Sequence, residues 1–224
     1  MENPTRKIQE KHYRELFQKH RGTTMAVSSE SPAHKELRFE HIAEIFENDD
    51  EFSVHDIGMG ISDFYSFLEK KFSNKKINYS GSDILKEFVD ESVSRYPNLD
   101  FYHRDISVEK VSDKYDYVIM SGLFHQRRES SIREWEKFAC NIIRNAFEMS
   151  QKGIAFNFIS PFVDFYQTEV YYSNLVKIIN FINDDLSRFF EIKHHYALFE
   201  YTVFVFTKDY IKSQHPQKEF QKYF

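Results

Sequence analysis

The sequence has little cysteine, no long apolar run and no strong excess of either charge. Cys140 is the one cysteine among 224 residues, which excludes an internal disulfide and fits a reducing compartment. No apolar run approaches the ~18 residues of a membrane-spanning helix, and no charged-then-apolar leader opens the chain. We therefore expect a soluble, cytoplasmic protein without a membrane partner, most simply one large domain with an N-terminal accessory segment.

The charges are nearly balanced. The net charge of −5 comes from 35 acidic and 30 basic residues that are interspersed, which argues against nucleic acid as a partner. The short cluster Gln126-Arg127-Arg128 is the exception. Aromatic residues make up 17% of the chain, and most of these rings must lie in a core, although composition does not separate core rings from pocket rings.

Hydrophobic periodicity predicts helices and strands that alternate along most of the chain. Two helices come first, at Thr5–Lys19 and Ala33–Phe46, with a loop over Arg21–Pro32 between them. Five strands are predicted next: Phe52–Ile57, Ile77–Gly81, Leu99–His103, Tyr115–Ser121 and Gly153–Ile159. The helices predicted among them are Phe64–Phe72, Ile84–Arg95 and Ile132–Met149.

The C-terminal part has a different pattern, with a helix predicted at Tyr171–Phe189 and strands at Phe190–Leu198 and Tyr201–Thr207. Two strands this close in sequence must pair antiparallel. We expect an α/β, Rossmann-like sheet of seven strands, mainly parallel, with an antiparallel C-terminal strand pair and helices on both faces. The expected organisation is an N-terminal helical cover at 1–36, a main domain at 37–210 and a polar, frayed tail at 211–224.

Two short segments carry the main functional signal. The first predicted strand ends in Asp-x-Gly-x-Gly at Asp56–Gly60, and the second ends at the acidic residue Asp83. This order is typical of a nucleotide-type pocket at the carboxyl edge of a parallel sheet. Gly58 and Gly60 let the backbone approach the ligand, and the later carboxylate accepts hydrogen bonds from ribose hydroxyls.

The residues that follow the glycines indicate which nucleotide fits. A dinucleotide site would place a third glycine near Asp63 and direct a helix N-terminus at a pyrophosphate. Here Ser62 and Asp63 follow the glycines, and we expect the carboxylate to repel phosphate. The pattern favours a ligand with adenine and ribose but no phosphate.

Four segments resemble the motifs of the class I S-adenosylmethionine-dependent methyltransferases, and the similarity runs from about Leu37 to Lys208. The segments are His55–Gly60, Tyr79–Ile84, Phe101–Ile106 and Tyr115–His125. The resemblance implies S-adenosyl-L-methionine as cofactor, S-adenosyl-L-homocysteine as product, and 37–210 as the methyltransferase domain. The cofactor-binding residues that it implies are Asp56, Gly58, Met59, Gly60, Asp83, Ile84, Asp105, Ile106, Ser121 and Gly122.

Within this set, the resemblance assigns the ribose hydroxyls to Asp83 and the adenine amino group to Asp105. A structural role, as helix cap or loop residue, is the alternative for each acid. Ser62 departs from the family, which often has a third glycine there; its hydroxyl could contact the ligand. The chain is also similar to a small bacterial branch often labelled trans-aconitate-methyltransferase-like, with members in sugar or natural-product pathways.

Residues of the N-terminal region could complete the cofactor site. Arg38 lies on an amphipathic helix, so it either faces solvent or forks onto the methionine carboxylate. Tyr13 and Thr23 could close over the same ligand as part of a lid. We include Arg38 and Tyr13 among the cofactor-binding candidates.

His125 is the catalytic candidate, because it follows the fourth predicted strand, where the methyl group should point. Methyl transfer needs a nucleophile in line with the C–S bond, and His can remove its proton near neutral pH. The alternative is a structural hydrogen bond to a loop carbonyl. His194 and His195 occupy adjacent positions in a predicted strand, so at most one of them can face the pocket. Asn157 and Tyr166 could orient an acceptor or only pack.

These residues support three functional hypotheses. The first is a methyltransferase for a small polar metabolite, with O-methylation favoured because His125 could act as base. The second is an RNA or protein methyltransferase, supported by Gln126-Arg127-Arg128. The third is a non-catalytic S-adenosylmethionine-binding protein. No His, Cys and acid cluster has metal-ligand spacing, so we expect no metal; the oligomeric state does not follow from the sequence.

Overall fold

The computed structural model describes residues 4–20 and 31–224. Most of the predicted loop, including Thr23, lies outside the described residues. Two helices precede the sheet: α1 (Pro4–His20) and α2 (Pro32–Ala43), which a short 3-10 turn at Glu44–Phe46 extends. Helix α2 begins where the sequence indicated, because Pro32 occupies its first turn and Ser31 Oγ accepts a hydrogen bond from the backbone N–H of His34.

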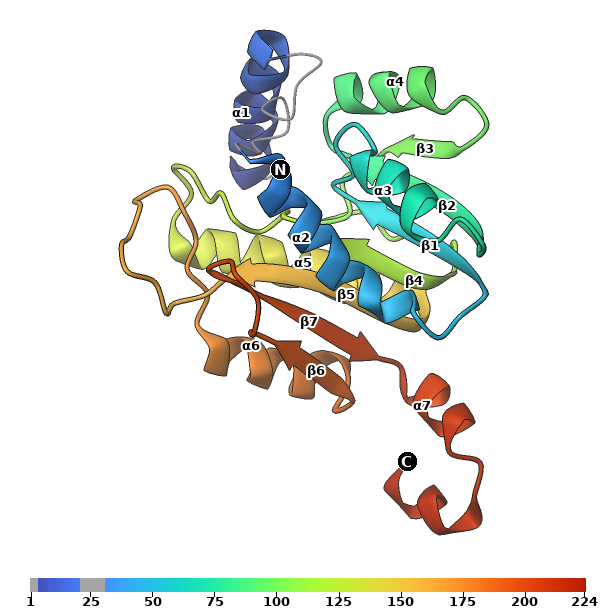
Figure 1. Ribbon diagram of the computed structural model, residues 1–224. Helices are drawn as coiled ribbons and strands as arrows, with labels where there is room; N and C mark the ends of the chain where they lie inside the picture. Colours follow the sequence, from blue (N-terminus) through green and yellow to red (C-terminus); the bar gives the residue numbers. More distant parts are fainter. Residues whose placement is uncertain (1–3, 21–30) are drawn as a thin grey trace.

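Seven strands form one sheet with the order β3-β2-β1-β4-β5-β7-β6 (Figure 1). Their bounds are β1 Glu51–Ile57, β2 Lys76–Asp83, β3 Asp100–His103, β4 Tyr115–Met120, β5 Ser150–Ile159, β6 Phe190–Lys193 and β7 Glu200–Phe206. The strands from β3 to β5 pair in parallel, and β7 runs antiparallel to both β5 and β6. This arrangement confirms the predicted fold class.

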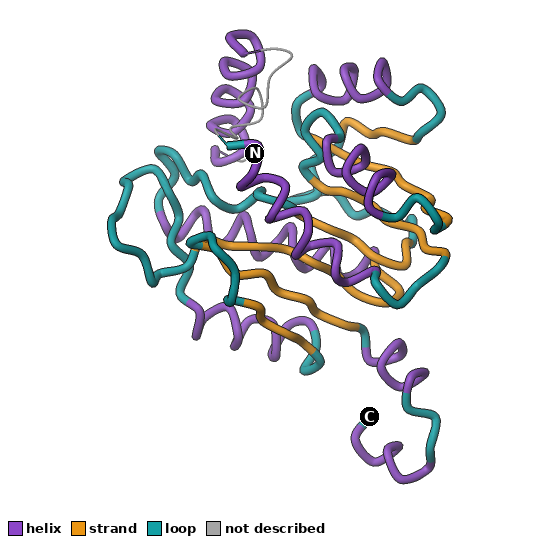
Figure 2. Tube along the Cα trace, in the orientation of Figure 1, coloured by secondary structure: helices purple, strands orange, loops and turns teal. Residues whose placement is uncertain are grey.

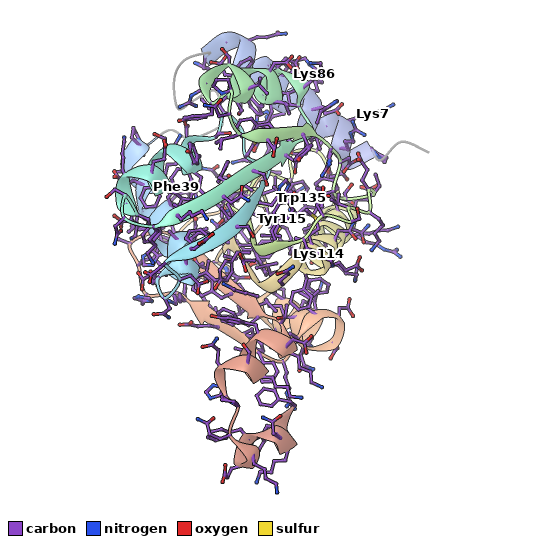
Figure 3. All side chains as sticks on the ribbon, turned by 90° about the vertical axis from the view of Figure 1, so that its right-hand side faces the viewer. Lys7, Phe39, Lys86, Lys114, Tyr115 and Trp135 are labelled. Atoms are coloured by element: carbon purple, nitrogen blue, oxygen red, sulfur yellow. The ribbon has the colours of Figure 1, made fainter. Side chains whose placement is uncertain are left out.

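Helices cover both faces of the sheet (Figure 2). Four helices lie between the strands in sequence: α3 Asp63–Lys71, α4 Lys86–Arg95, α5 Ile132–Met149 and α6 Leu175–Phe181. Successive side chains of a strand point to opposite faces, so Val118 of β4 packs in the core under α5 while Ile119 packs in the core under α2 and α3. Phe39 of α2 and Trp135 of α5 accordingly lie on opposite sides of the sheet (Figure 3).

The C-terminal helix and strand bounds differ from the prediction. The helix predicted from Tyr171 begins at Leu175, because the Asn174 side chain caps it by accepting from Lys177 N. Strand β6 ends at Lys193, so residues 194–199 connect it to β7. The predicted connection had only two residues. Tyr196 leaves the strand because its ring stacks on His41 at 4.0 Å and its hydroxyl bonds to Thr202.

The tail predicted to be frayed contains ordered helix. Thr207 caps α7 (Lys208–Gln214), and a 3-10 segment follows at Lys218–Tyr223; Figure 1 shows this segment extending away from the sheet. At the other end, the predicted border after residue 36 falls inside α2, so the bounds of the N-terminal cover stay a prediction. None of the helices in the described ranges has the length and apolar character needed to cross a membrane.

The core on the α2 side offers a direct stability test. Phe46 is fully buried and stacks on Phe52 with ring centroids 4.6 Å apart. Phe46→Ala should lower the free energy of unfolding by about 3–5 kcal/mol, because it removes buried ring area and leaves a cavity. Phe162, 68% exposed, is the matched control, with an expected change within about 0.5 kcal/mol. Urea unfolding measures both, and equal losses would contradict the assigned core.

Candidate functional site

A cavity of about 1260 Å³, including its open mouth, lies at the carboxyl ends of β1, β2 and β4. These candidates for cofactor binding and catalysis line it: Tyr13, Arg38, Asp56, Gly58, Met59, Gly60, Asp83, Ile84, Asp105, Ile106, Ser121, Gly122 and His125. Parallel strands bring their carboxyl ends to one edge of a sheet, so segments distant in sequence meet here. The structure thus brings the candidates together, while their roles remain predictions.

The turn after β1 requires left-handed backbone at several positions. Gly58 and Gly60 have φ values of 72° and 57°, which glycine adopts without strain. A Cβ on Gly58 would lie 2.6 Å from Leu123 Cδ1. Ser62 also has φ 60°, which explains why a glycine suits this position. Its hydroxyl donates to Ser92 Oγ at 2.9 Å, so its proton is engaged within the protein.

The N–H groups of this turn are already bonded within the protein. Gly58 N and Met59 N donate to Ser82 O at 2.8 and 3.2 Å, and Gly60 N donates to Asp83 Oδ2 at 3.1 Å. A pyrophosphate site needs such N–H groups free to point at the anion. The turn therefore disfavours a dinucleotide.

The expected role of Asp63 in repelling phosphate is wrong. Lys35 Nζ and Arg95 Nη1 lie 2.5 and 2.9 Å from the Asp63 carboxylate and neutralise its charge. Both cations come from other helices, α2 and α4, so the sequence around Asp63 did not reveal them.

Two carboxylates beside the turn are buried without an ion-pair partner in the described part of the chain. Asp83 accepts from Leu85 N at 2.8 Å as well as from Gly60 N, and burial raises its pKa to about 6. Asp56 accepts from the Tyr79 hydroxyl at 2.7 Å. Burial, with a smaller contribution from the charge of Asp83, raises the pKa of Asp56 to about 8. The site therefore favours either a proton or a cationic ligand group.

Asp105 presents an unused hydrogen-bond acceptor. Its Oδ1 accepts from Ser107 N and Ser107 Oγ at 2.9 and 2.5 Å. Its Oδ2 is buried and has no hydrogen bond within the described residues; the Arg6 guanidinium is 3.5 Å away. Ser121 Oγ is likewise buried and unpartnered there. A buried acceptor of this kind is costly unless a ligand donor satisfies it, and Asp105 lines the cavity where such a ligand would lie.

Helix α1 covers the cavity. Gln9 Nε2 donates to the backbone oxygen of Gln126 at 2.9 Å, and Arg14 forms an ion pair with Glu87 of α4 at 2.7 Å. Tyr13 lines the cavity and packs edge-on against Phe88. The helix therefore bridges α4 and the loop after β4. A helix in this position can act as a cover over the site.

Arg38 does not face solvent, because it pairs with a carboxylate inside the protein. Its Nε and Nη2 donate to Glu200 Oε2 and Oε1 at 2.8 and 2.5 Å, so its fork holds a carboxylate of the protein itself. Glu200 was missed because it lies 162 residues away in sequence. The one sequence signal is an acid at the start of an otherwise apolar strand. The remaining nitrogen, Nη1, lies 3.1 Å from the position that a Cβ on Gly122 would occupy, beside the cavity.

His125 lies in the loop after β4 and lines the cavity, but its basicity is lower than the expected role requires. It is 7% exposed, and burial, together with the charge of Arg38, lowers its pKa to about 4, although Glu200 opposes the shift. Asn157 Nδ2 lies 2.9 Å from its Nε2. A histidine with this pKa is neutral and weakly basic near pH 7, which opposes the role of general base.

A second hollow of about 1590 Å³, counting open space, adjoins the cavity and shares Arg38, His125 and Gln126 with it. Apolar and aromatic side chains contribute much of its lining: Ile159, Val163, Phe165, Val170, Tyr172 and Tyr196. Tyr166 is exposed and donates to Pro161 O, and it is not part of this wall. His194 and His195 are exposed in the connection after β6, so the expected strand placement is wrong for both.

No group of three or more His, Cys, Asp or Glu side chains within residues 4–20 and 31–224 is arranged to hold a metal.

Comparisons with known proteins support a methyltransferase fold. No family model matches the chain. A Mycobacterium tuberculosis protein named "Putative methyltransferase Rv1506c" is 27% identical over 165 residues, which cover 70% of this chain and 93% of that protein.

Two solved structures share the fold at low identity. Magnesium protoporphyrin IX methyltransferase from Synechocystis PCC 6803, with bound SAM, has a TM-score of 0.64 and 14% identity over 91% of this chain and 97% of that one. N-methyltransferase NodS from Bradyrhizobium japonicum WM9, with S-adenosyl-L-homocysteine, has a TM-score of 0.59 and 12% identity over 87% and 96%. The chain has a class I methyltransferase fold.

The buried carboxyl of Asp56 makes stability depend on pH. Its folded pKa of about 8 lies above its ordinary value of 3.8, so the protonated carboxyl stabilises the fold at low pH, and this contribution is lost as pH rises through about 8. Asp56→Asn should therefore raise the free energy of unfolding by more than about 1 kcal/mol at pH 8 and change it little at pH 4. Urea unfolding at both values tests this, and a variant less stable than wild type at pH 8 would contradict it.

Proposed function

We propose that this protein is an S-adenosylmethionine-dependent methyltransferase that acts on a small molecule. The observation that carries the proposal is the cavity at the carboxyl edge of the sheet. It is lined by two buried carboxyls with raised pKa values, Asp56 and Asp83, and by Asp105 with its unused acceptor. The fold shared with the methyltransferases supports the same reading.

The residues fit each part of this cofactor. Asp83 would accept from the ribose hydroxyls, and Asp105 Oδ2 would accept from the adenine amino group, which fills the buried acceptor. Ile84 and Ile106 would pack against the adenine ring. The glycine turn with Met59, and Ser121 with Gly122 across the cavity, would line the methionine part.

The charges of the cofactor suit the same site. S-adenosylmethionine carries a sulfonium and an ammonium. Both positive groups would stabilise the ionised carboxylates of Asp56 and Asp83. Arg38 Nη1 and Tyr13 would stand near the methionine end, with Arg38 still paired to Glu200.

The contribution of the chain is to hold and orient the reactants. When bound, S-adenosylmethionine supplies a methyl group activated by its positive sulfur. Helix α1 would limit the access of water to the bound cofactor, and the shared edge of the two hollows at His125 is where an acceptor would come into line. The adjoining hollow is large enough for a drug-sized molecule, since such sites span roughly 300–1,000 Å³.

Internal contacts of the basic cluster Gln126-Arg127-Arg128 disfavour a nucleic acid acceptor. Arg127 donates to the backbone oxygens of Ser130 and Thr168, and Arg128 pairs with Glu169. These contacts tie the loop after β4 to the loop after β5. The guanidinium groups are therefore engaged in the structure rather than displayed to phosphates, which a salt-dependent RNA site would need.

The acceptor atom and pathway remain finer hypotheses. O-methylation was favoured because His125 could act as base, and its pKa of about 4 withdraws that support for an unactivated alcohol. A sugar or natural-product acceptor, and the trans-aconitate-methyltransferase-like branch, rest on resemblance alone. Release of S-adenosyl-L-homocysteine in an acceptor screen separates an enzyme from a non-catalytic binding protein.

Calorimetric titration tests the cofactor assignment. Wild type should bind S-adenosylmethionine and S-adenosyl-L-homocysteine in preference to NAD. Asp83→Ala should weaken binding by about 1–3 kcal/mol, roughly 5-fold to 150-fold, because the ribose hydroxyls lose a carboxylate acceptor.

Asp209→Ala, in the first turn of α7 and away from the cavity, is the matched control and should bind like wild type. Preference for NAD, or equal affinity of the Asp83 and Asp209 variants, would overturn the assignment.

A further inference from the structure

A chain of hydrogen bonds runs through the protein behind the two hollows. Gly122 N donates to Asn157 Oδ1 at 2.7 Å, and Asn157 Nδ2 faces both His125 Nε2 at 2.9 Å and Glu200 Oε2 at 2.5 Å. Arg38 holds the other side of Glu200. Asn157 is fully buried, so each of these contacts matters energetically.

The backbone fixes which way the Asn157 amide points. Gly122 N–H is always a donor, so the amide oxygen must face it and the amide nitrogen must face His125 and Glu200. A reversed amide would set N–H against N–H at Gly122 and oxygen against carboxylate at Glu200. Both of these arrangements would leave buried groups unsatisfied, so the observed orientation is strongly favoured.

The orientation of the amide then determines where His125 carries its proton. Asn157 Nδ2 brings two hydrogens, one for Glu200 Oε2 and one for His125 Nε2. The ring nitrogen Nε2 must therefore be an acceptor, and the proton of the neutral imidazole must be on Nδ1. His125 Nδ1 has no hydrogen bond within the described residues, and His125 lines both hollows.

We propose that Asn157 is a positioning residue that holds His125 in the Nδ1–H tautomer, so that His125 offers a hydrogen-bond donor, not a base, to the methyl acceptor. The reference to an acceptor rests on the proposed function; the tautomer does not. An acceptor that fits would place a lone pair at Nδ1–H and would carry a nucleophile already unprotonated at neutral pH, such as a carboxylate or an amine of low pKa.

The pairing of Arg38 with Glu200 supports the neutral ring. These two are the charged groups that act on His125, with Glu200 Oε2 3.8 Å from Nε2. The carboxylate accepts from Arg38 and Asn157, and its tendency to raise the pKa of His125 is outweighed by burial and by the charge of Arg38. The hydrogen bonds of Asn157, Glu200 and Arg38 thus involve only the Nε2 side of the imidazole. The Nδ1 side is left for a ligand.

Long-range ¹H–¹⁵N spectra of the ¹⁵N-labelled, ligand-free protein test the proposal. Nε2 is recognised because it couples to both carbon-bound ring protons, and its ¹⁵N shift separates an acceptor nitrogen from an N–H nitrogen. His125 is assigned among the ten histidines by comparison with His125→Gln. We expect Nε2 as the unprotonated nitrogen, and a protonated Nε2 in wild type would overturn the proposal.

Asn157→Asp tests the cause, because it keeps the shape and replaces the donor that faces His125 with an acceptor. His125 should become protonated at Nε2, as the other tautomer or as the cation, and an unchanged Nδ1–H tautomer would overturn the role of Asn157. If this variant does not fold, the wild-type spectrum still decides the tautomer.

Two controls separate this effect from general loss of stability. Asn145→Asp also removes a buried amide donor, from the backbone oxygen of Ile106, and should leave the His125 tautomer unchanged. His55, held between Ser80 Oγ and Ser82 Oγ, is the internal reference in each spectrum. These measurements need no cofactor. The tautomer can therefore be wrong while the cofactor assignment is right, and the cofactor assignment can be wrong while the tautomer is right.

Discussion

Buried negative charge at the edge of the sheet is the constraint on which the site depends. Asp56, Asp83 and Asp105 are 2, 7 and 2% exposed, and among the described side chains Arg6 alone forms an ion pair with one of them, Asp105. Carboxylates removed from water are costly unless they bind a proton or a positive partner. The raised pKa values of Asp56 and Asp83 show that binding a proton reduces this cost. Binding a cationic ligand would also reduce it. A phosphate ligand would worsen the balance.

In the region beyond His125, by contrast, the buried charges are paired within the protein. There the charges of Arg38 and Glu200 cancel in a bidentate pair, and Asn157 ties the pair to the backbone at Gly122. The two hollows therefore differ electrostatically although they meet at one histidine. Such a division suits a reaction in which a positively charged donor and a separate acceptor must be held on either side of one point.

The sequence predicted most of the sheet, and it predicted that the cofactor-side candidates would meet at one edge of it, because both depend on local order. Asp56, Gly58 and Gly60 follow one apolar strand directly, and Asp83 ends the next, so strand positions and spacing place them at one edge. The pairing of Glu200 with Arg38 joins positions 162 residues apart, and no local pattern encodes it.

The same limit explains the errors. The basicity of His125 depends on burial and on the charges of Glu200 and Arg38, which come from β7 and α2. The charge of Asp63 is cancelled by Lys35 and Arg95 from two other helices. Strand β6 was predicted too long because the packing of Tyr196 on His41, not the apolar pattern, determines where the chain leaves the sheet.

A crystal structure of the complex with S-adenosyl-L-homocysteine tests the central claim most directly. The account predicts adenosine in the cavity with its amino group at Asp105 Oδ2, its ribose hydroxyls at Asp83, and its sulfur directed toward the hollow that begins at His125. A ligand bound elsewhere, or a cavity from which the ligand is absent at saturating concentration, would contradict it.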